Sequence, residues 1–154
     1  MAFHIVLVEP EIPANTGNIS RTCAATGTVL HLVRPLGFST DDKTLKRAGL
    51  DYWHSVSIEY HDSFDELRRT YPEATFYCAS TKAKRLYTEM QFRDGDFLVF
   101  GKETAGLPAS ILEEHADTLI RMPMTTNVRS LNLSNSAAII LYEALRQTNF
   151  LGLK

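Results

Sequence analysis

The chain has 154 residues, of which 44% are hydrophobic and 22% are charged, and its net charge is −2. That length allows one domain with a buried core, and the composition is that of an ordinary globular protein. The longest apolar run is far shorter than the roughly 18 residues that a membrane span needs. The slightly acidic balance provides no overall positive field for nucleic acid, so any RNA-binding surface must be local.

The N-terminal segment MAFHIVLVEPEIP is typical of a strand rather than of a signal peptide. It has no basic start, and it reaches a glutamate after eight residues. We therefore expect a cytoplasmic protein.

Apolar runs bounded by Pro, Gly and polar residues predict six strands that alternate with helices. The expected strands are Phe3 to Val8, Val29 to Val33, Trp53 to Tyr60, Thr75 to Ala79, Phe97 to Phe100 and Leu119 to Met122. The expected helices are Thr16 to Thr26, about Asp42 to Ala48, Ser63 to Tyr71, Leu107 to about Glu114 and Asn132 to about Thr148. This alternation predicts an α/β fold, a mainly parallel sheet with helices on both faces, in one domain over residues 1–154.

Several helix ends carry recognisable signals. Asn15 or Thr16 is the expected cap of the first helix, with Gly27 beyond its end. Pro108 is expected at the first position of its helix. The apolar residues of the last helix cover too wide an arc for a helix with one solvent-exposed face, because Ile139 lies outside its main apolar face. That helix is therefore either central or packed against another subunit.

The Cys and His residues indicate neither a disulfide framework nor a metal site. Cys23 and Cys78 lie among apolar residues, which predicts buried free thiols. The histidines follow no known ligand spacing, so we expect no metal. They are His4, His31, His54, His61 and His115.

Local basic clusters are the candidate RNA contacts, although for any one cluster alone a solvated surface face is the favoured explanation. One trio is spaced i, i+3, i+4, which places it on one face of a short helix. The clusters are Lys43, Lys46 and Arg47; Arg68 and Arg69; and Lys82, Lys84 and Arg85.

Three polar segments each follow an apolar strand and precede a helix, the position at which α/β sheets build ligand crevices. The first runs from Asn15 to Arg21, and the second is Gly101-x-Glu103-x-x-Gly106. The second is neither a P-loop nor a complete dinucleotide fingerprint, which argues against a dehydrogenase. The third, from Asn127 to Asn135, holds more hydrogen-bonding side chains than one helix cap requires.

Taken in this order, the segments resemble the motifs of the SPOUT superfamily of S-adenosylmethionine-dependent RNA methyltransferases, in its 2′-O-ribose branch. The matching residues are Asn15 and Arg21; Gly101, Glu103, Gly106 and Leu107; and Ser130-Leu131-Asn132. The likeness covers essentially the whole chain. The stretches EPEIPANTGNISR, DDKTLKRAGLDYW and RSLNLSN resemble the small subfamily that methylates the wobble nucleotide, cytidine or uridine 34, of certain leucine tRNAs.

The resemblance implies a deep trefoil knot in the C-terminal part of the chain, a homodimer with the site at its interface, and S-adenosylmethionine as cofactor. The implied partner is tRNA, bound through its anticodon stem-loop. The cofactor would be held largely by backbone groups of the knotted loops. The matching positions are Ala79, Ser80, Gly101, Met122, Ser130 and Leu131.

The family's activating arginine corresponds to Arg21, which would orient the ribose 2′-hydroxyl and stabilise its developing charge. The side chains that would hold Arg21 and the substrate in place are Asn15, Glu103, Ser130 and Asn132. The expected tRNA contacts are Lys43, Lys46, Arg47, Lys82, Lys84, Arg85 and Arg129.

Two other functions stay open. One is 2′-O-methylation of ribosomal RNA or of another tRNA position, although such relatives often carry an added RNA-binding domain and this chain starts at its first strand. The other is a non-catalytic RNA-binding module on the same fold, which would be expected to lose Arg21 or the Ser130/Asn132 pair.

Overall fold

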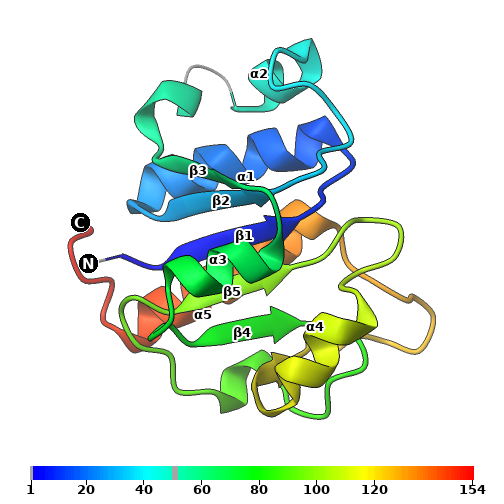
Figure 1. Ribbon diagram of the computed structural model, residues 1–154. Coiled ribbons are helices and arrows are strands. Elements are labelled where there is room, and N and C mark those ends of the chain that lie inside the picture. The colour runs from blue at the N-terminus through cyan, green and yellow to red at the C-terminus, as the bar shows by residue number, and fades with distance from the viewer. Residues whose placement is uncertain (1, 50–51) are drawn as a thin grey trace.

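The computed structural model describes residues 2–49 and 52–154. Its centre is a six-stranded sheet in the order β3-β2-β1-β5-β4-β6, in which neighbouring strands pair in parallel. Figure 1 shows α3 and α4 on one face of this sheet and α1 and α5 on the other. The predicted parallel α/β arrangement is confirmed. The strands are β1 (His4–Val8), β2 (Val29–Val33), β3 (Ile58–His61), β4 (Phe76–Ala79), β5 (Phe97–Phe100) and β6 (Leu119–Ile120).

The described residues form five α-helices and three short 3-10 helices, which lie between the strands or, for the last helix, after them. The α-helices are α1 (Pro13–Thr26), α2 (Lys43–Gly49), α3 (Phe64–Thr70), α4 (Ala109–Glu114) and α5 (Leu133–Gln147). The 3-10 helices are η1 (Tyr52–Ser55), η2 (Tyr87–Glu89) and η3 (Ala116–Thr118). Within the described ranges, no helix is long and apolar enough to span a bilayer.

Alternation of side chains along the buried strands divides the core into two layers. Ile5 and Leu7 of β1 face α1 and α5, whereas Val6 and Val8 face α3 and α4. Cys23 and Cys78 are both buried free thiols, as predicted. Burial raises the pKa of Cys78 to about 12, so this thiol stays protonated and inert.

The first helix starts earlier than predicted. It begins at Pro13 with Ile12 as its N-cap, and Asn15 and Thr16 lie inside the helix rather than capping it. Proline at the first helical position supplies a suitable φ and lacks an N–H that would have no partner there. The predicted end is confirmed, because Gly27 adopts a left-handed φ of 67°.

Three further predictions of local structure were wrong. The expected strand from Trp53 to Tyr60 is instead η1 followed by the shorter β3, because aromatic residues favour strands only where a neighbouring strand can pair with them. Pro108 is the N-cap of α4 and not its first helical residue. Strand β6 ends at Ile120, although Arg121 still forms a single bridge to Leu86.

Helix α5 is both central and partly uncovered. Ile140 and Leu141 are fully buried against the sheet, as the wide apolar arc predicted. Ile139 and Tyr142 remain 41% and 46% exposed. This exposed apolar edge is available to a second molecule.

Candidate active site

The carboxyl ends of three parallel strands and the segment after β6 enclose a cavity of about 520 Å³, within the usual range for ligand sites. Residues that follow β1, β4, β5 and β6 all contribute to its wall, although they are far apart in the sequence. Figure 1 shows the loops after β5 and β6 at the same end of the sheet. A parallel sheet brings these strand ends to one edge, which is where α/β proteins bind ligands.

All six positions predicted to hold the cofactor line this cavity. They are Ala79, Ser80, Gly101, Met122, Ser130 and Leu131. Asn15, Glu103 and Asn132 line it too, together with the basic residues Lys82 and Arg129. The three polar segments singled out in the sequence therefore meet at one place.

The cavity combines apolar walls with exposed loop backbone, a composition that fits a nucleoside carrying an amino-acid chain. Leu107, Ile120 and Ile140 supply apolar surface on which a base could lie. Gly101 is required by the fold of its loop, because a Cβ at that position would lie 2.1 Å from the carbonyl carbon of Gly106. Gly106 itself adopts a left-handed φ of 69° and donates its N–H to the Lys102 carbonyl at 2.8 Å.

Glu103 joins the loop after β5 to the start of α1. Its Oε1 accepts from the backbone N–H of Glu11 at 2.9 Å, and its Oε2 accepts from that of Ile12 at 3.0 Å. The Asn15 amide also donates to Oε2, at 3.1 Å. Both oxygens thus accept hydrogen bonds from protein donors, which hold the loop after β5 against the start of α1.

Asn15 extends the same chain of hydrogen bonds to α5. Its Oδ1 accepts from Asn132 Nδ2 at 3.2 Å. Asn132 Oδ1 in turn caps α5, accepting from the backbone N–H groups of Ser134 and Asn135 at 2.9 and 3.2 Å. Because Asn15 is only 6% exposed, its polar groups depend on these two partners. The three motifs are therefore linked by one polar chain.

Glu11 makes a reciprocal contact that the sequence analysis missed. Its carboxylate accepts from Thr104 N at 3.0 Å and from Thr104 Oγ1 at 2.7 Å. These hydrogen bonds lower the pKa of Glu11. The only sequence signal for this role is that Glu11 lies in the loop after β1, and many loop residues in such positions make no such contact.

Arg21 is not brought to the cavity within this chain. It follows Asn15 by six residues, which is about 9 Å along α1 and about 120° away around the helix. Arg21 is exposed, and its guanidinium lies 5.5 Å from the centre of the Tyr52 ring. Placing Arg21 with the other predicted catalytic residues would require another molecule.

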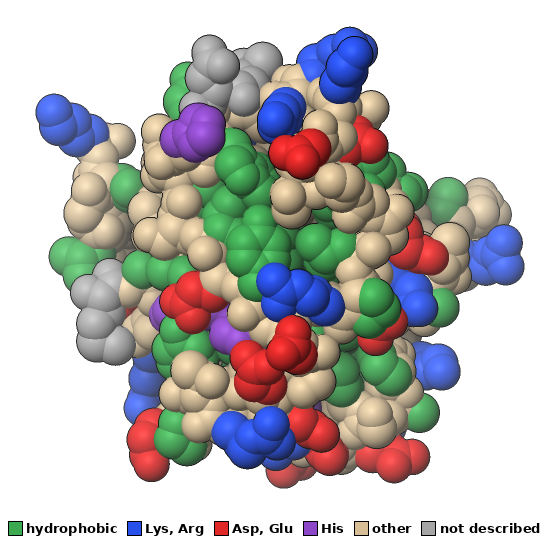
Figure 2. All heavy atoms as spheres, turned by 45° about the horizontal axis from the view of Figure 1, so that its top comes forward, with side chains coloured by type: hydrophobic (Ala, Val, Ile, Leu, Met, Phe, Trp, Pro, Cys, Tyr) green, Lys and Arg blue, Asp and Glu red, His purple; other side chains and the backbone are tan. Residues whose placement is uncertain are grey.

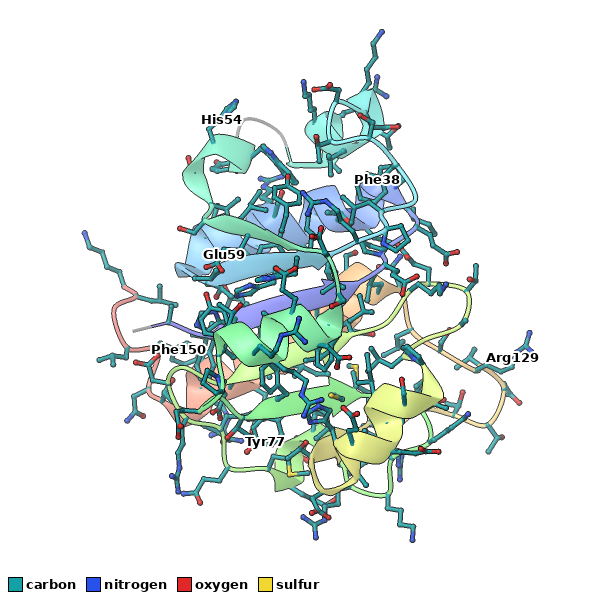
Figure 3. All side chains as sticks on the ribbon, viewed as in Figure 1. Phe38, His54, Glu59, Tyr77, Arg129 and Phe150 are labelled. Carbon is teal, nitrogen blue, oxygen red and sulfur yellow. The ribbon has the colours of Figure 1, made fainter. Side chains whose placement is uncertain are left out.

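The basic residues expected to bind RNA are exposed but dispersed. Lys82 and Arg129 lie at the cavity, and Figure 3 shows Arg129 projecting outward from the loop before α5. Lys84 and Arg85 follow shortly after Lys82. The trio Lys43, Lys46 and Arg47 lies on α2, which packs on α1 near the opposite edge of the sheet (Figure 1).

The SpoU rRNA methylase family model matches residues 2–142. The chain belongs to this family. Its members are methyltransferases, and the resemblance drawn from the three motifs is confirmed.

Individual relatives of this SpoU family chain include a tRNA (cytidine(34)-2′-O)-methyltransferase of Saccharophagus degradans, which is 50% identical over 153 residues and 99% of both chains. A structure solved for insights into the 2-OH methylation of C/U34 on tRNA is 44% identical, with a TM-score of 0.92 over 96% of this chain and 97% of that one. The AdoMet-bound rRNA methyltransferase of Sinorhizobium meliloti is 25% identical, with a TM-score of 0.85 over 94% of this chain and 56% of that one. S-adenosylmethionine is thus a cofactor found in the family.

Proposed function

We propose that this protein transfers a methyl group from S-adenosylmethionine to the ribose 2′-hydroxyl of nucleotide 34, the wobble position, in leucine tRNAs. The observation that carries the proposal is the single cavity at which all three motifs meet. The names of the nearly full-length relatives support tRNA position 34 over other RNA sites. The motif stretches that resemble the wobble-directed subfamily support leucine tRNAs and either pyrimidine at that position.

Ala79, Ser80, Gly101, Met122, Ser130 and Leu131 would hold the cofactor, because they line the cavity at the ends of β4 and β5 and along the segment that leads into α5. When bound, the cofactor supplies a methyl group on a sulfonium, which is already a strong electrophile. The protein must then mainly align the ribose hydroxyl with that methyl carbon and exclude competing water.

Arg21 is the proposed activating residue. With a pKa above about 12, a guanidinium is a poor base, so its role is to orient the hydroxyl and stabilise the developing oxyanion. The hydrogen-bond chain through Glu103, Asn15 and Asn132 fixes the loops against which the ribose lies. A substrate phosphate is the proposed acceptor of the proton.

We further propose that the active form is a homodimer in which one subunit supplies Arg21 to the cavity of the other. Arg21 is exposed on α1 and absent from the cavity wall of its own chain. Ile139 and Tyr142 on α5 and Ile12 at the cavity offer exposed apolar surface for such an interface. A second subunit would cover this surface and complete the site at the same time.

The RNA would then lie across basic residues near the cavity and on α2. Lys82, Lys84, Arg85 and Arg129 are exposed on or next to the cavity wall. Lys43, Lys46 and Arg47 lie on the exposed surface of α2. Dispersed contacts of this kind suit the phosphates of a folded anticodon stem-loop.

The resemblance also supports a deep trefoil knot, in which α5 would pass through the loop formed after β5. In keeping with this path, the segments after β5 and β6 line one cavity, and α5 returns to pack against α1 and β5. Such a crossing would hold the cofactor loops together.

Methyl transfer to a defined RNA tests the proposed function. Two leucine tRNA transcripts would be compared, one unmodified and one with a 2′-deoxyribose at nucleotide 34 only. Labelled S-adenosylmethionine should label the first transcript and not the second, because only the first carries the acceptor hydroxyl. Equal labelling of both transcripts would contradict the proposed position, and labelling of ribosomal RNA alone would favour the alternative substrate.

A further inference from the structure

Three histidines lie in a row across β1, β2 and β3, on the sheet face that α3 covers. His4 Nδ1 lies 2.8 Å from His31 Nε2, and His31 Nδ1 lies 2.9 Å from His61 Nε2. His31 is fully buried and His61 is 4% exposed. None of these residues lines the candidate active site, so that chemistry does not account for the cluster.

A carboxylate completes the cluster because of the parallel register between β2 and β3. Glu59 is the register partner of His31, and His61 follows Glu59 by two residues, which places both side chains on one face. His31 is far from Glu59 and His61 in the sequence, so no local motif reveals all three residues. The sequence predicted no metal site because its histidines follow no local ligand spacing.

The distances within the cluster match those of a metal site. Glu59 Oε1 lies 3.8 Å from His31 Nδ1 and 3.9 Å from His61 Nε2, and those nitrogens are 2.9 Å apart. A point equidistant from the three atoms lies about 2.1 Å from each, which is the length of zinc bonds to imidazole nitrogen and carboxylate oxygen. The three ligand atoms thus already surround a space of the right radius.

Further residues support each of the three ligands, as is usual around bound metals. The Tyr71 hydroxyl donates to both oxygens of Glu59, at 2.7 and 2.8 Å. The other nitrogen of His31 faces His4, and the other nitrogen of His61 lies 3.6 Å from Glu66 Oε1.

We propose that His31 Nδ1, His61 Nε2 and the Glu59 carboxylate bind a divalent transition-metal ion, for which Zn²⁺ suits the two-nitrogen, one-oxygen set. Water would be the fourth ligand, because the Glu59 side chain is 42% exposed. Figure 3 shows Glu59 on the edge strand β3, and Figure 2 shows histidine atoms visible between acidic side chains on this side of the molecule.

Binding requires only a local rearrangement. Tetrahedral ligands at zinc are about 3.3 Å apart, so the two nitrogens must separate by a few tenths of an ångström and Glu59 Oε1 must approach both of them by about 0.5 Å. The ion replaces the hydrogen bond between His31 and His61. With the ion on Nδ1, the His31 proton would reside on Nε2 and be donated to His4 Nδ1, which requires the His4 proton to lie on Nε2. The ion would link edge strand β3 to β2 and stabilise the fold.

Metal titration of the purified, chelator-treated protein tests this proposal. Co²⁺ in a four-coordinate site absorbs visible light strongly, whereas aqueous Co²⁺ does not. The wild-type protein should develop this absorption with one ion per chain, Zn²⁺ should displace the Co²⁺, and Zn²⁺ should raise the unfolding temperature. Absence of the absorption, or of any shift with excess Zn²⁺, would mean that the cluster is only a hydrogen-bonded row of rings.

Two variants locate the ion. Glu59→Gln keeps an acceptor for Tyr71 but removes the carboxylate ligand, and should weaken Zn²⁺ binding at least tenfold. His54→Gln changes an exposed histidine on η1, distant from Glu59 in Figure 3, and should bind Zn²⁺ as the wild type does. Loss of binding in His54→Gln, or unchanged binding in a folded Glu59→Gln protein, would overturn the assignment. The wild-type titration decides the question even if Glu59→Gln does not fold.

Discussion

At the scale of single residues, Arg21 and Glu103 have opposite surroundings although both belong to the motifs of the site. Glu103 is held by three hydrogen-bond donors of its own chain, whereas Arg21 is exposed and contacts Tyr52. A residue that organises loops needs such fixed partners, and one that meets an incoming ribose must be accessible. This contrast supports a positioning role for Glu103 and a catalytic role for Arg21.

Arg21→Lys should lose most methyl transfer while keeping affinity for S-adenosylmethionine. A lysine ammonium is a point charge and cannot reproduce the planar fork of donors that orients the hydroxyl. Single-turnover rates and calorimetric cofactor binding would measure the two effects separately. Arg93→Lys, a change at an exposed arginine before β5 that belongs to none of the motifs or basic clusters, is the matched control and should leave both unchanged. Near-normal turnover in Arg21→Lys would remove it from the mechanism.

Glu11→Gln should weaken cofactor binding at neutral pH, because a neutral amide accepts less strongly from Thr104 than a carboxylate does. The pKa of Glu11 is lowered in the folded protein. The contribution of its ionised carboxylate to the contact with Thr104 is therefore complete above the ordinary pKa of 4.5. This contribution is lost as the pH falls through the lowered pKa of Glu11. The difference in cofactor affinity between variant and wild type should therefore shrink in acid. A difference that does not change with pH would show that Glu11 acts by another route.

At the scale of elements, the residue that caps α5 and stabilises this helix also belongs to the candidate active site. Asn132 Oδ1 caps the helix, and Asn132 Nδ2 donates to Asn15. The two functions lie on different atoms of one side chain. They can therefore be separated by substitution.

Asn132→Ala should lower the free energy of unfolding by about 1 kcal/mol, the usual cost of a lost cap. Asn132→Asp keeps an oxygen for the cap but loses the donor to Asn15, so it should keep most of the stability and still lose activity. Chemical denaturation and methyl-transfer rates on the same preparations would check this. Equal losses of stability in the two variants would show that the cap and the contact with Asn15 cannot be separated in this way.

The sequence predicted elements well where the pattern was local. The buried strand Phe97–Phe100 and the start of the last helix near Asn132 were predicted correctly, because each depends on a few neighbouring residues. Strand β3 was misplaced because pairing along β2 decides where it begins. The contact between Glu11 and Thr104 and the cluster around His31 could not be predicted, since each depends on residues that only the sheet topology brings together.

At the scale of the whole molecule, one chain contains a nearly complete site and an exposed apolar edge on α5. If a second subunit covers that edge, Ile139→Glu should produce monomers, because an unpaired carboxylate would be buried in the interface. Sedimentation velocity and methyl-transfer rates should show loss of the dimer and of activity together. Leu151→Glu, a change at a 74% exposed residue beyond α5, is the control. A fully active monomer would refute the shared site.

The measurement that tests the central claim most directly is the position of the methyl group in RNA. RNA from cells that lack this protein would be treated with the purified protein and S-adenosylmethionine, and methylated nucleosides would be mapped by mass spectrometry in tRNA and ribosomal RNA alike. We predict a single new 2′-O-methyl group, at nucleotide 34 of leucine tRNAs. A new methyl group at any other position, or none on either RNA despite bound cofactor, would contradict the account.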